Sequence, residues 1–227
     1  MTAPRGKLLV LEGPEGAGKT TQAPLLAEWL RSLGHDVIAA REPGGTAVGD
    51  EVRRILLDSP DGAVGDAAEA LLYMASRAQL VERIVRPGLA RGAIVLLDRF
   101  FLSTYAYQVA GRGLAEDEVR AANQLAVGHL VPDLTILLTI PPTEGLARAD
   151  RRGGRDRLER ADAAFHERVA RAFAMYSDAE WQRNHPECGP VMSVDATGEV
   201  RDVFDRVVEA LTSHWPESFP RDRRQPV

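Results

Sequence analysis

The chain has little of what would tie it to a disulfide framework or to a membrane. Its 227 residues include one cysteine, Cys188, so no disulfide can form within the chain. No apolar run approaches membrane-spanning length, and the residues before Lys7 contain no apolar signal core. From these absences we expect a cytoplasmic protein without a membrane partner.

Lysine is scarce, and the net charge is negative. The chain has 28 Lys and Arg residues, of which only Lys7 and Lys19 are lysines, against 33 Asp and Glu, for a net charge of −5. This balance excludes a sequence-wide affinity for nucleic acid, so we expect no nucleic-acid partner. Neither lysine follows an asparagine, which excludes the Asn-Lys-x-Asp element of guanine-reading switches.

One of the two lysines lies in the most informative motif of the chain. Residues 13–20 have the G-x-x-x-x-G-K-T spacing of a phosphate-binding P-loop, and they follow the apolar run 8–11. The backbone N–H groups of such a loop turn inward on a polyphosphate. Lys19 then reaches the β- and γ-phosphates, and the Thr20 hydroxyl ligates Mg²⁺. The motif predicts binding of a nucleoside triphosphate.

Apolar runs alternate with helical patterns along the chain. We expect strands at 7–12, 36–40, 93–98, 134–139 and 191–194, and helices at 19–32, 48–58, 66–90, twice within 102–128, and at 142–149, 161–184 and 200–214. This alternation predicts a three-layer α/β/α P-loop fold with a five-stranded parallel sheet. We expect a single domain over 1–215 and a flexible tail over 216–227.

Ligands of parallel sheets bind where the strands end, so the residues after each expected strand are candidates for the site. Arg41-Glu42-Pro43 follows the second strand and leads into a Gly-Gly turn. Asp98 ends the third strand and suits the hydration shell of Mg²⁺. Arg99 stands where motor ATPases carry Glu, and it is better suited to gripping a phosphate than to activating water.

Two helices carry polar residues at helical spacing. In the helix from residue 66, Tyr73 and Arg77 are four apart, while an apolar stripe is expected to face the core; it comprises Leu71, Met74, Ala75, Ala78, Val81 and Val85. After Asp98, four neutral polar residues form i, i+4 pairs that suit an uncharged heterocycle; they are Ser103, Thr104, Tyr107 and Gln108. Spacing alone leaves open a solvated helix face in both places.

The densest cluster of charge lies at 148–157, where five arginines surround Gly153-Gly154. Arginines on a hinged segment can close over a triphosphate and neutralise the charge that develops during transfer. A solvated charge run is the alternative for this segment taken alone. With a P-loop upstream, the sequence favours a short mobile lid at about 148–158.

Taken in order, these motifs resemble the thymidylate kinases among the P-loop nucleoside monophosphate kinases. The matching segments are 12–21, 41–46, 72–77, 98–100, 103–108 and 156–159, within a resemblance from Leu8 to about His214. This resemblance implies transfer of the γ-phosphoryl group of ATP to dTMP, giving dTDP and ADP. It also implies Mg²⁺ as the cofactor and a homodimeric enzyme. A kinase for another monophosphate remains the alternative, followed by a nucleotide-dependent ATPase or switch.

The resemblance also implies roles for individual residues. ATP is expected to contact the P-loop and the loop after the last strand: Gly13, Pro14, Glu15, Gly16, Ala17, Gly18, Lys19, Thr20, Thr21, Asp195, Ala196 and Thr197. The expected dTMP contacts are Glu15, Arg41, Glu42, Pro43, Arg53, Tyr73, Arg77, Arg99, Ser103, Thr104, Tyr107 and Gln108. Thr20 and Asp98 are the expected metal ligands. The expected catalytic residues are Lys19 and Arg99 with a lid arginine, chosen among Arg151, Arg152, Arg155 and Arg157 because the P-loop has no arginine.

Overall fold

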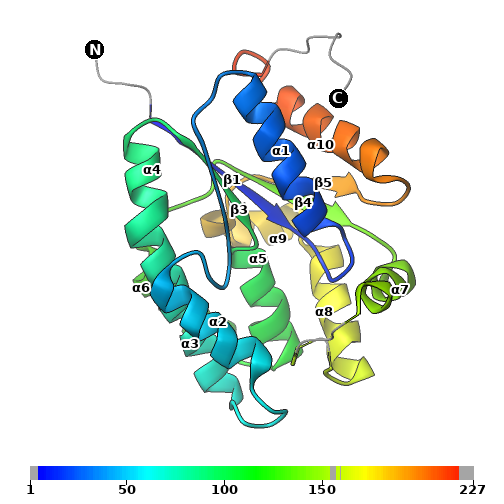
Figure 1. The fold of residues 1–227 in the computed structure, drawn as a ribbon. Helices are drawn as coiled ribbons and strands as arrows, with labels where there is room; N and C mark the ends of the chain where they lie inside the picture. The colour runs from blue at the N-terminus through cyan, green and yellow to red at the C-terminus, as the bar shows by residue number, and fades with distance from the viewer. Residues whose placement is uncertain (1–4, 154–156, 159, 220–227) are drawn as a thin grey trace.

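A computed structural model describes residues 5–153, 157–158 and 160–219 (Figure 1). Its sheet is built from β1 (Lys7–Glu12), β2 (Val37–Arg41), β3 (Ile94–Asp98), β4 (Leu134–Thr139) and β5 (Val191–Asp195). All pairings are parallel, in the order β2-β3-β1-β4-β5. Leu11 of β1 is in register with Asp98 of β3, so the P-loop begins beside the carboxyl end of β3.

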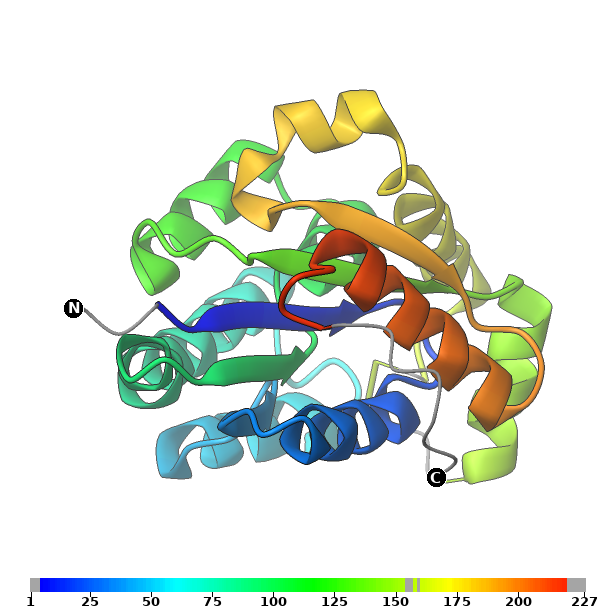
Figure 2. The same ribbon diagram turned by 90° about the horizontal axis from the view of Figure 1, so that it is seen from above.

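Helices cover both faces of the sheet. One layer contains α1 (Lys19–Ser32) and α10 (Val200–His214), which crosses in front of the strands in Figure 2. The other layer contains α3 (Asp66–Leu80), η1 (Val81–Val85), α4 (Arg86–Ala90), α5 (Phe101–Thr104), η2 (Tyr105–Gly111), α6 (Glu116–Val127) and α8 (Ala163–Met175). Along β1, Leu8 and Val10 join one core and Leu9 and Leu11 the other. The three central strands, β3, β1 and β4, are therefore almost wholly apolar, because both of their faces are buried, whereas the edge strands β2 and β5 are partly exposed.

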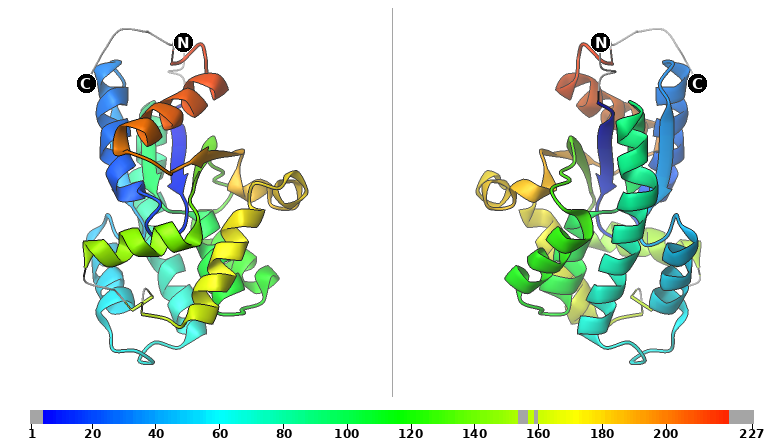
Figure 3. Two further views of the ribbon diagram at one scale, coloured as in Figure 1. Left: turned by 90° about the vertical axis from the view of Figure 1, so that its right-hand side faces the viewer. Right: turned by 90° about the vertical axis from the view of Figure 1, so that its left-hand side faces the viewer.

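The remaining helices lie around the carboxyl ends of the strands or at the edge of the sheet. They are α2 (Ala47–Asp58), α7 (Pro142–Arg152), α9 (Ala179–Asn184) and η3 (Pro186–Cys188). Figure 3 shows α7 lying across the loop that follows β1. The three-layer α/β/α arrangement predicted from the sequence is confirmed. In the described ranges, no helix is long and apolar enough to cross a membrane.

Three details differ from the expectations. The helix expected over 161–184 is two helices, because the Asp178 side chain accepts hydrogen bonds from the N–H groups of Glu180 and Trp181 and so begins α9 anew. The stripe on α3 is only partly core: Met74 is buried, but Leu71 is 63% exposed.

In the part of that stripe that continues into η1, Val81 and Val85 are also buried, while Ala75 on α3 is exposed and Ala78 is half-buried.

The third difference is at the end of the chain, where Phe219 is 1% exposed and its ring lies against Trp29 and Trp215. The folded domain thus extends past the expected boundary at residue 215. Residues 220–227 of the expected tail lie outside the described residues.

Candidate active site

The loop after β1 approaches α7 very closely. Gly16 and Gly18 have φ angles of 72° and 91°, which glycine adopts without strain. A Cβ on Gly16 would lie 2.0 Å from the carbonyl oxygen of Gly145 in α7, so no larger residue fits there. The loop and α7 therefore form one wall of the site.

Lys19 is held under this loop. Its ammonium donates to the carbonyl oxygens of Gly13 and Pro14, at 2.8 Å each. Burial and the neighbouring charge of Arg99 lower the pKa of Lys19 to about 8, although nearby carboxylates act in the opposite direction. A polyphosphate in the loop would add further negative charge beside this ammonium and so favour its charged form.

Two oxygen donors meet beside Lys19. The Thr20 hydroxyl donates to a carboxylate oxygen of Asp98 at 3.1 Å. No group of three or more His, Cys, Asp or Glu side chains that could hold a metal occurs among the described residues. A hydroxyl and one carboxylate nevertheless fit Mg²⁺, which keeps several waters and takes its other ligands from substrate phosphates.

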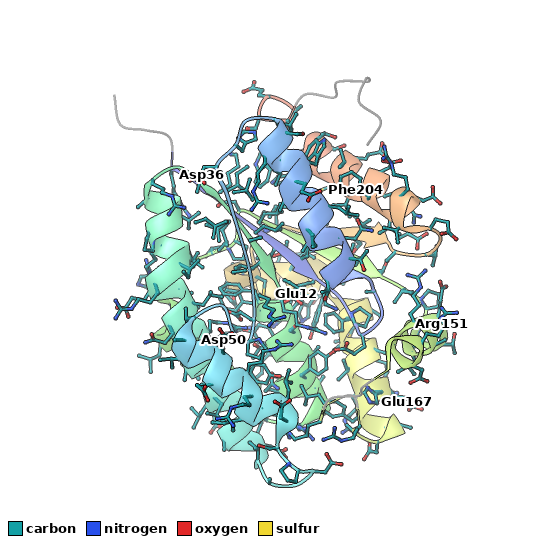
Figure 4. All side chains as sticks on the ribbon, in the orientation of Figure 1. Glu12, Asp36, Asp50, Arg151, Glu167 and Phe204 are labelled. Atoms are coloured by element: carbon teal, nitrogen blue, oxygen red, sulfur yellow. The ribbon has the colours of Figure 1, made fainter. Side chains whose placement is uncertain are left out.

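Glu12, at the centre of the molecule in Figure 4, organises the backbone after β3. It is fully buried, and its carboxylate accepts from the N–H groups of Phe100 and Ser103 and from the Ser103 hydroxyl. Directly before the first of these contacts, Arg99 has a φ of 74°, a strained value for a residue other than glycine. The charge of Glu12 thus holds the Arg99 backbone in a conformation that aims its guanidinium at the P-loop.

The side chain of Arg99 connects the P-loop to η2. It forms an ion pair with Glu15 at 2.5 Å and donates to the Ser103 hydroxyl at 3.0 Å, and it lies 5.3 Å from the Tyr107 ring centroid. The Tyr107 hydroxyl donates to the same Glu15 carboxylate at 2.9 Å. Burial raises the pKa of Tyr107 well above its ordinary value, so this hydroxyl stays neutral and keeps its proton for donation.

Two cavities meet in this cleft. The larger has a volume of about 1000 Å³ and is lined by residues 15–22 of the P-loop and α1, by Asp98, and by Arg148 and Arg151 of α7. The smaller extends toward α3 and η2. Four residues line both: Glu15, Glu42, Arg53 and Arg99. A phosphate held by the two arginines would therefore face both cavities.

The smaller cavity brings together the polar residues expected on two helices. Tyr73 and Arg77 line it from α3, with Pro43 beside β2, and the other side is formed by Ser103, Thr104, Tyr107 and Gln108. Leu57, Phe100 and Leu158 complete its lining. Aromatic and apolar walls with a few fixed polar groups are typical of a pocket for a flat heterocycle.

Arg77 forms a buried network rather than pointing free into the cavity. Its N–H groups donate to Glu42 at 2.8 Å, to the Thr104 hydroxyl at 3.0 Å, to Asn123 and to the Phe100 carbonyl oxygen at 2.8 Å. With a further ion-pair contact to Glu42 at 2.6 Å, all three nitrogens of its guanidinium have partners. Arg77 thus acts on the cavity through the hydroxyl of Thr104. Burial raises the pKa of Glu42, and Arg77 opposes this rise.

The arginines expected in the lid are spread over different surroundings. Arg151 is exposed on α7 at the rim of the larger cavity (Figure 4). Arg157 is buried and pairs with Glu69 at 2.5 Å, away from the P-loop. The Arg152 side chain and all of Arg155 lie outside the described residues.

The loop after β5 reaches the edge of the larger cavity. Asp195 accepts from the N–H and the hydroxyl of Thr197, at 2.9 Å each, which shapes the loop. Arg148 donates to the carbonyl oxygens of Ala196 at 2.9 Å and Gly198 at 3.2 Å. Gly198 lines the cavity, whereas Asp195, Ala196 and Thr197 stand behind it.

Sequence reasoning gave no role to three residues that shape the cleft. Glu12 ends a buried strand just before the P-loop. A carboxylate in such a place needs hydrogen-bond donors around it, and this could have pointed to its role. Arg148 belongs to the arginine-rich segment, but nothing in its spacing distinguishes it. Glu69 lies on α3 four residues before Tyr73, and its partners come from distant segments, so no local pattern could have revealed its role.

A parallel sheet around a P-loop, with a second arginine-lined cavity facing the phosphate loop, defines a nucleotide-binding phosphotransferase of the P-loop kinase class. Residues 11–203 match the family model described as thymidylate kinase, and the chain belongs to that family.

Curated relatives agree over most of the chain. A thymidylate kinase of Deinococcus radiodurans is 51% identical over 79% of this chain and 86% of its own length. A thymidylate kinase of Exiguobacterium sp. is 41% identical over 90% of this chain and 93% of its own length. A thymidylate kinase of Lactobacillus delbrueckii subsp. bulgaricus is 41% identical over 95% of this chain and 100% of its own length. The family predicted from the ordered motifs is thereby confirmed.

Proposed function

We propose that the chain is a dTMP kinase, which transfers the γ-phosphoryl group of ATP to the 5′-phosphate of dTMP and releases dTDP and ADP. The observation that carries this proposal is the meeting of the two cavities at Arg53 and Arg99. A donor phosphate in the P-loop and an acceptor phosphate at these arginines would lie next to each other. The thymidylate kinase family of the chain supports the choice of nucleotide.

ATP would occupy the larger cavity, with its phosphates in the P-loop and its base near the loop after β5. The backbone N–H groups of Gly13 and of residues 15–21, together with the Lys19 ammonium, would bind the phosphate oxygens. Thr20 and Asp98 would hold Mg²⁺, which, when bound, supplies charge neutralisation on the β- and γ-phosphate oxygens.

dTMP would occupy the smaller cavity and the junction. Its phosphate would compete with Glu15 for Arg99, which frees the Glu15 carboxylate to accept from a sugar hydroxyl. Tyr107, packed beside Glu15, would crowd a 2′-hydroxyl and so disfavour ribonucleotides. The thymine ring would stack on Tyr73, with Thr104 and Gln108 at its polar edge.

The transfer asks the protein for position and charge rather than for a nucleophile. An oxygen of the dTMP phosphate attacks the γ-phosphorus, and the bond to the ADP oxygen breaks. Lys19, which is buried, and Arg99, which is half-buried, would neutralise the charge that spreads over the transferred group, since both are fixed by hydrogen bonds. No side chain has to take a proton in this step.

Among the arginines expected in the lid, Arg151 is our choice for contact with the transferred phosphate. Its side chain lines the larger cavity and is exposed, whereas Arg157 is held by Glu69. Arg152 and Arg155 belong to the same proposed lid at about 148–158, as further catalytic candidates.

The chain is also proposed to act as a homodimer. Large apolar side chains are exposed on neighbouring helices: Leu71 on α3 is 63% exposed and Leu125 on α6 is 89% exposed. The two helices pack on each other and, with α2, form one side of the molecule in Figure 3 (right). An exposed apolar face of this kind is typical of a protein–protein interface.

Release of ADP from Mg-ATP, measured in parallel with dTMP, dUMP, dCMP, dGMP, UMP and AMP, tests the proposed function. We expect turnover with dTMP to exceed that with the others. Faster turnover with another monophosphate would reject dTMP as the substrate. Release that needs no acceptor would reject the kinase reaction.

A further inference from the structure

Glu69 is a fully buried carboxylate behind the smaller cavity, and its partners come from two separate segments, η2 with the residue that ends it and the stretch around Arg157. It accepts from Gln108 at 2.9 Å, from Arg112 at 2.9 and 3.2 Å and from Arg157 at 2.5 Å. Burial acts to raise the pKa of Glu69, but the hydrogen bonds from Arg112, Gln108 and Arg157 outweigh it and lower that pKa. Glu69 is therefore ionised and can only accept hydrogen bonds.

An acceptor-only neighbour fixes the orientation of the Gln108 amide. Gln108 lines the smaller cavity and is 1% exposed. Its Nε2 must face Glu69, because the opposite orientation would put the amide oxygen against a carboxylate. No hydrogen bond to Oε1 occurs within the described part of the chain, so this oxygen is the group that Gln108 offers to a ligand.

Glu69 also fixes a wall of the cavity through Arg157. The Arg157 guanidinium donates to the Leu56 carbonyl oxygen at 2.8 Å. The backbone N–H of Arg157 donates to the Leu57 carbonyl oxygen at 3.2 Å. The next residue, Leu158, is buried and lines the cavity. The same carboxylate thus positions the amide and an apolar wall of the cavity.

The structure assigns a specificity role to this arrangement: we propose that Glu69 is a positioning residue that makes the cavity present an acceptor, the Gln108 Oε1, to the ring N–H of a pyrimidine base. This inference rests on the proposed function. Thymine carries a hydrogen on N3, whereas cytosine has a lone pair there. The Thr104 hydroxyl can donate or accept, so the orientation of Gln108 is the element that discriminates.

The replacement Glu69→Gln tests the role without changing side-chain size. The new amide would direct its oxygen to the arginines and its NH₂ to Gln108, whose own amide would then turn and present a donor to the cavity. The readout is kcat/KM for dTMP and for 5-methyl-dCMP, which differ only at the N3 and C4 edge of the base. We expect the ratio of the two values to fall by about tenfold or more.

Arg112→Gln is the matched control. Arg112 contributes two hydrogen bonds to the same carboxylate but lines neither cavity. Its replacement leaves Glu69 as an acceptor, so the ratio should stay at the wild-type value even if the protein is less stable. A loss of activity that is equal for both substrates in Glu69→Gln, or an equal change of ratio in Arg112→Gln, would overturn the inference. A wild-type enzyme that does not prefer dTMP would instead reject the proposed function.

Gln108→Glu provides a second test that leaves Glu69 in place. Two adjacent carboxyls share a proton, which raises the pKa of one of them. Below that pKa the new carboxyl donates to Glu69 and still presents an oxygen to the cavity, so preference for dTMP over 5-methyl-dCMP should be retained. Turnover of dTMP should then fall as the pH rises through that pKa. A pH profile parallel to that of the wild type would contradict the proposed contact.

Discussion

At the residue scale, the charge of Lys19 depends on what occupies the P-loop. Without a phosphate its ammonium is buried against carbonyl groups, and its pKa is about 8. A bound polyphosphate favours the charged form, so the protein must take up a proton when it binds ATP above this pH. At neutral pH Lys19 is therefore mostly positively charged and can bind an anion, and it loses this charge as the pH rises above its pKa.

We predict that the affinity for ATP is constant below the pKa of Lys19 and falls as the pH rises above 8, by up to about tenfold for each pH unit. Titration calorimetry at pH 8.5, in two buffers with different ionisation enthalpies, should show net proton uptake. Lys19→Met should bind ATP more weakly and should lose this proton uptake. An equal uptake in both proteins would assign the titration to another group.

Glu12 illustrates how a buried charge can maintain strain near a reaction centre. Its replacement by Ala leaves the N–H groups of Phe100 and Ser103 without an acceptor beside the strained Arg99. We predict that Glu12→Ala lowers the free energy of unfolding by about 3 kcal/mol, because two buried donors lose their partner. Denaturant unfolding measures this change. Glu12→Gln keeps an oxygen acceptor and should cost less; equal losses would show that the hydrogen bonds are not the cause.

At the element scale, the packing of α7 on the P-loop connects the proposed lid to the donor site. A Cβ on Gly145 would lie 2.7 Å from the carbonyl oxygen of Glu15. We predict that Gly145→Ala displaces α7 and raises KM for ATP by about tenfold, with the fold retained. Steady-state kinetics at saturating dTMP would measure this.

Gly65→Ala is the control for this substitution, since Gly65 has an ordinary φ and no heavy atom within 4 Å of its Cβ position. It should leave KM unchanged. A normal KM in Gly145→Ala would show that α7 and the loop are not coupled as the structure indicates.

The elements were largely predictable from the sequence, because the central strands β3, β1 and β4 are buried on both faces and are therefore nearly continuous apolar runs. The failures have local physical causes. The Asp178 cap divides a helix that periodicity alone had joined. On α3, Arg77 occupies the buried side with its network, so Leu71 faces outward although it is apolar.

The candidate site was predictable where its chemistry is local, as in the P-loop. The spacing of Thr104 and Gln108 placed both on one helix face but left open whether that face is solvated, and the structure buries both residues. The site was not predictable where partners far away in the sequence fix a side chain, since no sequence pattern pairs Arg157 with Glu69 or gives Arg77 its four hydrogen bonds. Such networks depend on tertiary packing. The roles given to individual residues in catalysis and binding stay predictions.

At the scale of the whole molecule, the exposed apolar side chains on α3 and α6 form the face that we propose is covered by a second copy of the chain. We predict that Leu125→Glu converts a homodimer into a monomer, because a charge in a buried apolar interface is strongly unfavourable. Sedimentation velocity measures the change. Met175→Glu on α8, at a side chain that is 55% exposed, is the control and should remain dimeric. A wild-type monomer would reject the proposed dimer.

The central claim is that the two cavities place a donor and an acceptor phosphate together at Arg99. It is tested most directly by incubating the protein with Mg²⁺, dTMP and ATP labelled in the γ-phosphoryl group, and following where the label goes. We predict that the label passes to dTDP in step with ADP release, and that Arg99→Gln slows this transfer by about 10²-fold or more. Label that accumulates in inorganic phosphate, or transfer that is unaffected in Arg99→Gln, would contradict the account.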